Sequence, residues 1–313
     1  MSDDNARTRV LYVGGMPRSG STLLTWILGQ LPGHCALGEV YYVWSAGVER
    51  DQTCGCGVPF SRCEFWTAVG DEAFGGWGSV DLDRVKALKS RVDKTSRIPH
   101  VLLARRMPSF RRDRDEYAAL MTRLYTAAAR VAGSPILVDG SKRPSLAYIL
   151  RMSPDIDLRM VQLVRAPHGV VHSWSKQIAL PAGIGANDYL KVRPTRVITR
   201  RWVTVNATVR AVRHLGVPLI TIRYEDLVAD PHGVLDRIAR FCDIEPGEAS
   251  AFVQPDGVHL PPAHMVAGGR MRFTPSPLTL RLDETWRSEM PVGKRRVVSG
   301  ATALARRRYG YSR

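Results

Sequence analysis

The chain has 313 residues, 44% of them hydrophobic and 24% charged, and its formal net charge is +16. This length and composition allow a sizeable core, and we expect a single domain over residues 1–313. We find no apolar run near the roughly 20 residues of a membrane span and no signal-peptide pattern, which predicts a cytoplasmic protein. The basic residues are spread along the chain without a polybasic block or a nucleic-acid-binding signature, so an anionic small ligand is favoured over nucleic acid.

The first predicted element is a short strand that leads through a glycine-rich turn into an amphipathic helix, over residues 10–30. Gly15 and Gly20 have the G-x-x-x-x-G spacing of a P-loop, but Ser21 stands where a nucleotide triphosphatase has its phosphate-binding lysine. Backbone N–H groups at the start of the helix and the guanidinium of Arg18 can still bind a diphosphate-like group. The segment therefore predicts an anion-binding cradle for a donor other than ATP.

Four of the five cysteines lie early in the chain, at Cys35, Cys54, Cys56 and Cys63. The last three fall within TCGCGVPFSRCEFW, where the Cys54-x-Cys56 spacing is tighter than the usual C-x₂₋₄-C of zinc sites. The sequence leaves three states open for these cysteines: a zinc site, a disulfide, or reduced thiols that pack beside aromatic residues.

Residues 80–132 are rich in arginine, alanine and leucine at helical spacing, which predicts a helical insertion that ends at Gly133. Three apolar runs follow, and they predict strands at Ile136–Val138, up to Val164, and around Leu219–Ile222. Further helical segments are expected at 202–216 and 231–244. Apolar strands separated by helices predict an α/β protein with a P-loop-like, three-layer fold, in which a central parallel sheet is flanked by helices.

Three motifs together resemble one enzyme family: PRSGST at residues 17–22, LVRAPHGVVHSWSKQ at 163–177 and IRYEDL at 222–227. They look like the sulfotransferases that use 3′-phosphoadenosine-5′-phosphosulfate (PAPS), and among these they are more similar to the bacterial, carbohydrate and tyrosylprotein branches. The resemblance spans most of the chain. It implies transfer of a sulfuryl group from PAPS to a hydroxyl, with 3′-phosphoadenosine-5′-phosphate (PAP) as product, and we expect no metal to be required.

The resemblance also implies which residues bind the donor. The 5′-phosphosulfate is assigned to the first loop, where an arginine replaces the lysine of other branches: Arg18, Ser19, Gly20, Ser21 and Thr22. Arg165 and Ser173 are implied to bind the 3′-phosphate. A proline-rich stretch over roughly 255–277 contains HMVAGGRMRF, which resembles a cofactor-covering loop. Its expected donor contacts are Gly268, Arg270 and Arg272, and a solvated basic loop is the alternative.

In-line transfer to a hydroxyl needs a base for the acceptor proton and cations for the transferring and leaving oxygens. The resemblance implies that Glu39 is the general base, against the alternative of a surface glutamate at a turn. It implies that Lys142 and Arg18 contact the sulfuryl or bridging oxygen, and a solvated turn lysine is the alternative for Lys142. His34 and His264 are outside candidates for the base.

Other polar residues near these motifs are interpreted as structural. Asp139 and Ser141 are expected to orient the ammonium of Lys142, and Asp226 to cap the following helix. Trp202 is either buried core or an adenine contact, and the core is favoured. Two other functions stay open: a P-loop-like small-molecule kinase and a non-enzymatic nucleotide- or RNA-binding protein. The acceptor pocket is expected from the loops 46–79, 101–115 and 180–194, which leaves small-molecule, sugar and lipid hydroxyls open.

Overall fold

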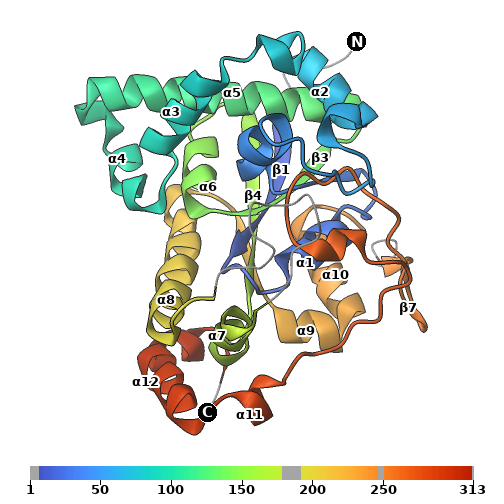
Figure 1. Ribbon diagram of the computed structural model, residues 1–313, viewed down its shortest axis with the longest axis vertical. Coiled ribbons are helices and arrows are strands. Elements are labelled where there is room, and N and C mark those ends of the chain that lie inside the picture. The colour runs from blue at the N-terminus through green and yellow to red at the C-terminus, as the bar shows by residue number, and fades with distance from the viewer. Residues whose placement is uncertain (1–6, 178–191, 246–249, 312–313) are drawn as a thin grey trace.

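The computed structural model describes residues 7–177, 192–245 and 250–311. Within these residues the central element is a five-stranded parallel sheet with the order β2-β3-β1-β4-β5 (Figure 1). Its strands are β1 (Thr8–Gly15), β2 (His34–Gly38), β3 (Ile136–Lys142), β4 (Ile156–Val164) and β5 (Leu219–Arg223). β1 is the middle strand, so the turn that follows it opens at the centre of the carboxyl edge.

Both faces of the sheet are covered by helices because the strands are apolar on both sides. In β1, Val10 and Tyr12 belong to one core, and Leu11 and Val13 belong to the other. The first core contains side chains from α2 (Glu64–Phe74), α3 (Leu82–Val92), α4 (Ile98–Leu102), α5 (Pro108–Ala132), α6 (Pro144–Leu150) and α8 (Thr195–Ala211). The second contains side chains from α1 (Ser21–Leu28), α9 (Tyr224–Ala229) and α10 (Pro231–Phe241). The predicted three-layer α/β fold is confirmed.

A third, smaller cluster contains Trp202 and joins α8 to α7 (Pro167–Ser175), α11 (Trp286–Glu289) and α12 (Val292–Arg308). The helices α7, α11 and α12 lie at the lower end of the molecule in Figure 1. A two-stranded hairpin is formed by β6 (Val253–Gln254) and β7 (Gly257–Val258). The shorter helical turns are η1 (Val40–Tyr42), η2 (Val43–Val48), η3 (Phe60–Arg62), η4 (Trp77–Ser79), η5 (Thr95–Arg97), η6 (Ala104–Arg106), η7 (Val212–Leu215) and η9 (Arg270–Phe273).

The three strands predicted downstream are confirmed as β3, β4 and β5. The sequence predictions omit β2, because HCALG is short and contains no run of β-branched residues. The predicted helix end at Gly133 is confirmed, since α5 stops there and this glycine has a left-handed φ of 57°. The helix predicted over 202–216 is α8, which begins earlier than expected and continues into η7.

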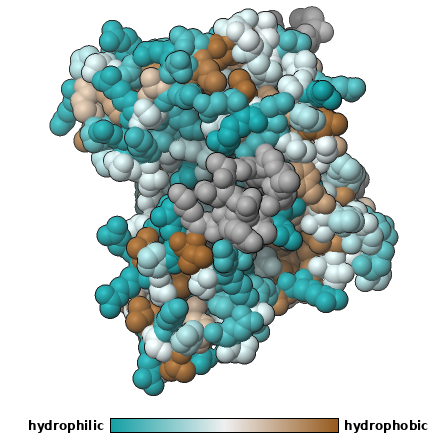
Figure 2. All heavy atoms as spheres, in the orientation of Figure 1, coloured by the Kyte–Doolittle hydropathy of each residue, from teal (hydrophilic) through white to brown (hydrophobic). Residues whose placement is uncertain are grey.

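The face of the molecule shown in Figure 2 is mainly hydrophilic, with scattered hydrophobic side chains. This distribution agrees with the strongly basic composition of the chain. Among the described helices, none combines the length and the apolar character that crossing a membrane requires. The cytoplasmic location stays a prediction.

Candidate active site

The turn between β1 and α1 needs glycine at two positions. Both Gly15 and Gly20 have positive φ angles, of 151° and 89°. A Cβ atom at Gly15 would lie 2.3 Å from the carbonyl oxygen of Leu163, and one at Gly20 would lie 2.5 Å from the ring of Tyr224. Glycine lets the chain turn tightly against both neighbours, and the turn then presents the N-terminus of α1 at the edge of the sheet where ligands bind.

The N-terminus of α1 has the features of an anion-binding site. The first turn of this described helix has no acidic residue, and its N-cap is Gly20, which has no side chain to accept a hydrogen bond. Ser19 and Ser21 are buried, and the Ser19 hydroxyl has no hydrogen-bond partner within the described residues. Unpaired N–H donors and a positive helix end favour a negatively charged ligand.

Arg18 meets two residues from a distant segment, Arg165 and Ser173, beside this turn. Arg18 Nε donates a hydrogen bond to Ser173 Oγ over 2.9 Å, and Arg165 Nη1 donates to the carbonyl oxygen of Arg18 over 3.3 Å. Burial, followed by the nearby charge of Arg165, lowers the pKa of Arg18. Two guanidinium groups at one helix N-terminus form a strong anion-binding arrangement, at the positions that the motifs indicate.

Arg165 has a partner that the sequence did not indicate. Its Nη2 lies 3.1 Å from Oδ2 of Asp283, and its guanidinium lies 4.8 Å from the centre of the Tyr224 ring. Partial burial raises the pKa of Asp283, but hydrogen bonds from Thr285 and Arg165 outweigh this and lower it to about 2. An anion that binds Arg165 therefore has to share the guanidinium with the Asp283 carboxylate or displace it.

Glu39 and Lys142 lie at the ends of the neighbouring strands β2 and β3. Lys142 Nζ and Glu39 Oε1 are 2.5 Å apart, and the two residues are only 8% and 9% exposed. The backbone of Lys142 has a left-handed φ of 63°, which is uncommon for a residue with a side chain. The alternatives of a surface glutamate and a solvated lysine are wrong, because the two charges form a buried ion pair.

The sequence predicts that Asp139 and Ser141 orient the ammonium of Lys142, but in the structure these two residues make other hydrogen bonds. The Asp139 carboxylate accepts hydrogen bonds from the backbone N–H of Ser141, from its hydroxyl, and from the Tyr125 hydroxyl. Ser141 Oγ in turn accepts from the backbone N–H of Tyr41 over 2.8 Å. Burial raises the pKa of Asp139 to about 6. These residues therefore shape the backbone that carries Glu39 and Lys142 rather than orienting the lysine directly.

The predicted covering loop contacts both Glu39 and the cradle. A Cβ atom at Gly268 would lie 3.3 Å from Glu39 Oε1, and Gly269 N–H donates to Thr22 Oγ1 over 3.2 Å. Arg272 is buried, which lowers its pKa to about 10, and it donates to the carbonyl oxygen of Gly268 over 2.6 Å. Arg270 is exposed. The solvated-loop alternative is wrong for Arg272, whose guanidinium holds the loop itself.

Residues 11–248 match the profile of the sulfotransferase family. The chain belongs to this family and is a sulfotransferase. Its structure is similar to the sulfotransferase domain of the Synechococcus PCC 7002 olefin synthase, with a TM-score of 0.50 and 21% identity over 99% of this chain and 98% of that one. It is also similar to the sulfotransferase domain of the curacin biosynthetic pathway, with a TM-score of 0.47 and 17% identity over 95% and 98%. No curated protein matches the sequence.

The other residues that the sequence singled out lie elsewhere in the sulfotransferase. Trp202 is buried and its indole N–H donates to the carbonyl oxygen of Arg165 over 2.9 Å, which confirms the core interpretation. His34 lies at the amino end of β2, where its Nδ1 is 2.9 Å from the carbonyl oxygen of Pro32. The predicted cap at Asp226 is wrong, since that residue lies inside α9 and Asp230 accepts from the N–H of Gly233 instead.

Two cavities show where ligand space lies among the described residues. One of about 290 Å³ is lined in part by Arg165, Asp283 and Trp286. A larger one of about 820 Å³ lies at the opposite, amino edge of the sheet, lined in part by Arg7. Arg165 connects the smaller cavity to the glycine turn, because its Nη1 donates to the carbonyl oxygen of Arg18. Residues 180–191 of one predicted acceptor loop lie outside the described residues.

Proposed function

We propose that this sulfotransferase takes its sulfuryl group from PAPS, transfers it to a hydroxyl of a small-molecule, sugar or lipid acceptor, and releases PAP. The observation that carries the proposal is the convergence of Arg18, Arg165 and Ser173 beside the glycine turn. A donor with phosphate groups at both its 5′ and 3′ positions needs anion-binding groups at two neighbouring places. The cradle supplies the first with Ser19 to Thr22, and Arg165 with Ser173 supplies the second.

The roles in the transfer follow from the buried pair beside the cradle. Glu39 takes the proton of the acceptor hydroxyl while the acceptor oxygen attacks sulfur. The bond from sulfur to the PAP oxygen breaks in line with this attack. Lys142 holds the Glu39 carboxylate in position before transfer, since its ammonium lies 2.5 Å from that group. Arg18 and Lys142 then stabilise the negative charge that grows on the leaving oxygen. Gly268 and Gly269 let the covering loop approach the donor.

This arrangement balances charge with side chains and a helix N-terminus, so we propose that the transfer step itself uses no metal. The kinase and nucleic-acid-binding alternatives are set aside, because the family and the fold are those of sulfotransferases. A kinase would also need a cation at the position that Ser21 occupies. Arg270 and Arg272 remain proposed donor contacts, with Arg272 reaching the donor only if it gives up its present bond to the loop.

Calorimetric titration with PAP tests the donor. We expect PAP to bind more tightly than ATP in the presence of a chelator. Arg165→Ala and Ser173→Ala should each weaken PAP binding about ten- to hundredfold, because each loses a hydrogen bond to a charged group. Arg159→Ala is the matched control: it removes an arginine of β4 whose Nη2 pairs with Asp243 over 2.8 Å. Equal loss in Arg159→Ala, or preference for MgATP, would contradict the proposal.

A further inference from the structure

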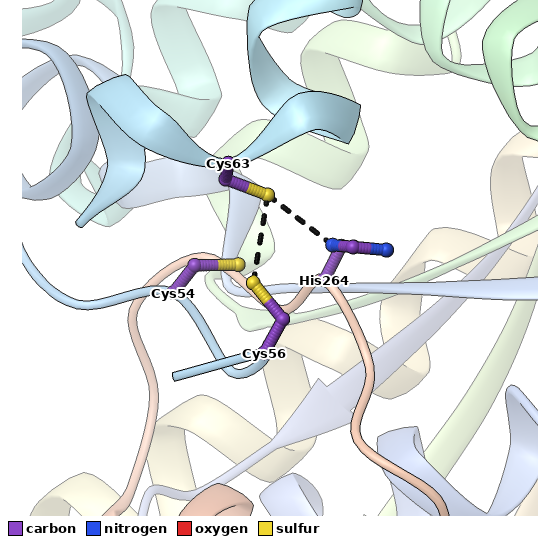
Figure 3. Close-up of side chains that lie close together, drawn as sticks. All are labelled: Cys54, Cys56, Cys63 and His264. Atoms are coloured by element: carbon purple, nitrogen blue, oxygen red, sulfur yellow. Dashed lines mark hydrogen bonds between the residues drawn. The ribbon is translucent and has the colours of Figure 1, made fainter. Parts of the chain in front are cut away.

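Three cysteines and one histidine converge beside the covering loop, outside the pair of Glu39 and Lys142. They are Cys54, Cys56, Cys63 and His264, and their three sulfur atoms and one imidazole nitrogen all lie within 4.8 Å of one another. Figure 3 shows the sulfur atoms and Nδ1 of His264 directed towards one another, while the second ring nitrogen points away. Cys35 does not belong to this group, which instead joins the three cysteines of TCGCGVPFSRCEFW to a histidine from far along the chain.

The spacing of these atoms fits a bound metal ion better than a disulfide. Cys56 Sγ and Cys63 Sγ are 3.7 Å apart, and Cys63 Sγ lies 3.2 Å from His264 Nδ1. A tetrahedral zinc ion with bonds of about 2.3 Å to sulfur separates its sulfur ligands by about 3.8 Å. A disulfide bond is only about 2.0 Å long. An iron–sulfur cluster holds its cysteines around several metal atoms, which needs more room than this group leaves.

We propose that Cys54, Cys56, Cys63 and His264 bind one Zn²⁺ ion in a closed structural site. The ligand set is Cys₃His, which is one of the usual sets of structural zinc sites and fills all four tetrahedral positions with protein atoms. Cys63 is the N-cap residue of α2, where the helix end favours a thiolate. The short Cys54-x-Cys56 spacing is accommodated by a tight turn, in which Gly57 N–H donates to the carbonyl oxygen of Cys54.

The groups around the site hold the histidine in its place. The indole N–H of Trp66 donates to the carbonyl oxygen of His264 over 2.8 Å, and the ring of Phe65 stacks on the imidazole at 5.3 Å. Gly55 N–H donates to the carbonyl oxygen of Met265 over 3.0 Å. Such outer contacts fix the orientation of metal ligands. Residues 54–66 and the covering loop are thus already held in contact, as a shared ion requires.

The ion would tie together two segments that lie about 200 residues apart in the chain, Cys63 and His264 being 201 residues apart. Two residues after the histidine, Val266 exchanges backbone hydrogen bonds with Leu37 and Glu39, at 2.9 and 2.8 Å. Gly269 then contacts Thr22 of the cradle. The zinc site therefore anchors the start of the covering loop next to Glu39. Only this consequence rests on the proposed function, whereas metal binding itself does not.

Metal analysis of the purified protein tests the inference directly. Protein produced in zinc-supplemented medium and purified without chelators should contain one zinc per chain. After replacement by Co²⁺, it should show the visible bands of tetrahedral cobalt and a thiolate charge-transfer band. Cys56→Ser should lose the zinc, whereas Cys35→Ser and Cys242→Ser, which remove the two cysteines outside the group, should keep it. In Cys56→Ser, amide hydrogen exchange over residues 264–272 should become faster.

The wild-type measurement decides the matter even if Cys56→Ser fails to fold. Metal-free protein with five titratable thiols, or a disulfide between Cys56 and Cys63 found by mass spectrometry, would overturn the zinc site. So would zinc that Cys35→Ser removes and Cys56→Ser retains. The result is independent of donor binding: zinc without PAP binding would refute the proposed donor alone, and PAP binding by a metal-free protein would refute the zinc site alone.

Discussion

The buried pair of Glu39 and Lys142 can be tested by a double-mutant cycle that uses stability as its readout. At 2.5 Å and an effective dielectric constant of about 20, the two charges attract by about 7 kcal/mol. Removing each ion from water costs several kcal/mol, so the pair as a whole contributes little net stability. Losing one partner is different, because it leaves the other charge buried and unpaired. We expect Lys142→Met to lower the free energy of unfolding by about 3–5 kcal/mol.

The second arm of the cycle is Glu39→Gln, and the double variant closes it. We expect the double variant to be more stable than the sum of the single effects predicts, by at least about 3–5 kcal/mol, since it buries no unpaired charge. Urea unfolding at neutral pH, followed by tryptophan fluorescence, measures each free energy. Lys142→Met keeps the left-handed backbone of that position, so the backbone strain cancels in the cycle.

A surface pair provides the control for this cycle. Lys176 Nζ lies 3.2 Å from Glu289 Oε2, but both side chains are well exposed, so Lys176→Met should cost less than about 1 kcal/mol. If the effects of Lys142→Met and Glu39→Gln instead add within about 0.5 kcal/mol, the two side chains do not interact. The role given to Lys142 in holding the Glu39 carboxylate in position would then be wrong.

Two further predictions concern the elements that support this centre. Gly20→Ala should lower the free energy of unfolding by about 1–3 kcal/mol more than Gly216→Ala. Both positions have positive φ, but only Gly20 has a ring within 2.5 Å of the added Cβ. Equal losses in thermal unfolding would exclude that contact. The pKa of Asp139 is raised to about 6, so its stabilising contribution is full below about pH 4 and is lost as the pH rises through 6. Asp139→Asn should abolish this fall of about 3 kcal/mol in urea unfolding, and an unchanged pH slope would contradict the shift.

The parts of the site that one segment encodes could be predicted from the sequence. The cradle is such a part, because Gly15, Gly20 and the start of α1 follow one another in the chain and their geometry is set by local backbone conformation. The strands β3, β4 and β5 were predictable for the same reason, since each is a continuous apolar run between helices. Arg165 and Ser173 could be placed together because a strand end and the following helix join them directly.

Pairings between distant segments could not be predicted in the same way. The strand β2 is short and has no run of β-branched residues, so the apolar pattern does not place Glu39 beside the end of β3, where Lys142 lies. Asp283 lies in a segment without a motif, and only the fold brings it to Arg165. A charged residue is usually exposed, and it is found buried only where a partner pairs with it, so its partner decides which of these it is.

For the covering loop, the residue types predict the position of the glycines but not the direction of Arg272. Two arginines after two glycines indicate a phosphate-binding loop, and the glycines do lie against Glu39 and Thr22. Arg272 instead donates hydrogen bonds to the carbonyl oxygens of Gly268, in its own loop, and of Thr53. A guanidinium has five N–H donors, and when it is buried its donors bond to the nearest carbonyl oxygens, here through Nη1 and Nη2. The sequence identifies the residue type that such a loop needs, whereas the direction in which Arg272 points depends on a distant segment, since its Nη2 donates to the carbonyl oxygen of Thr53.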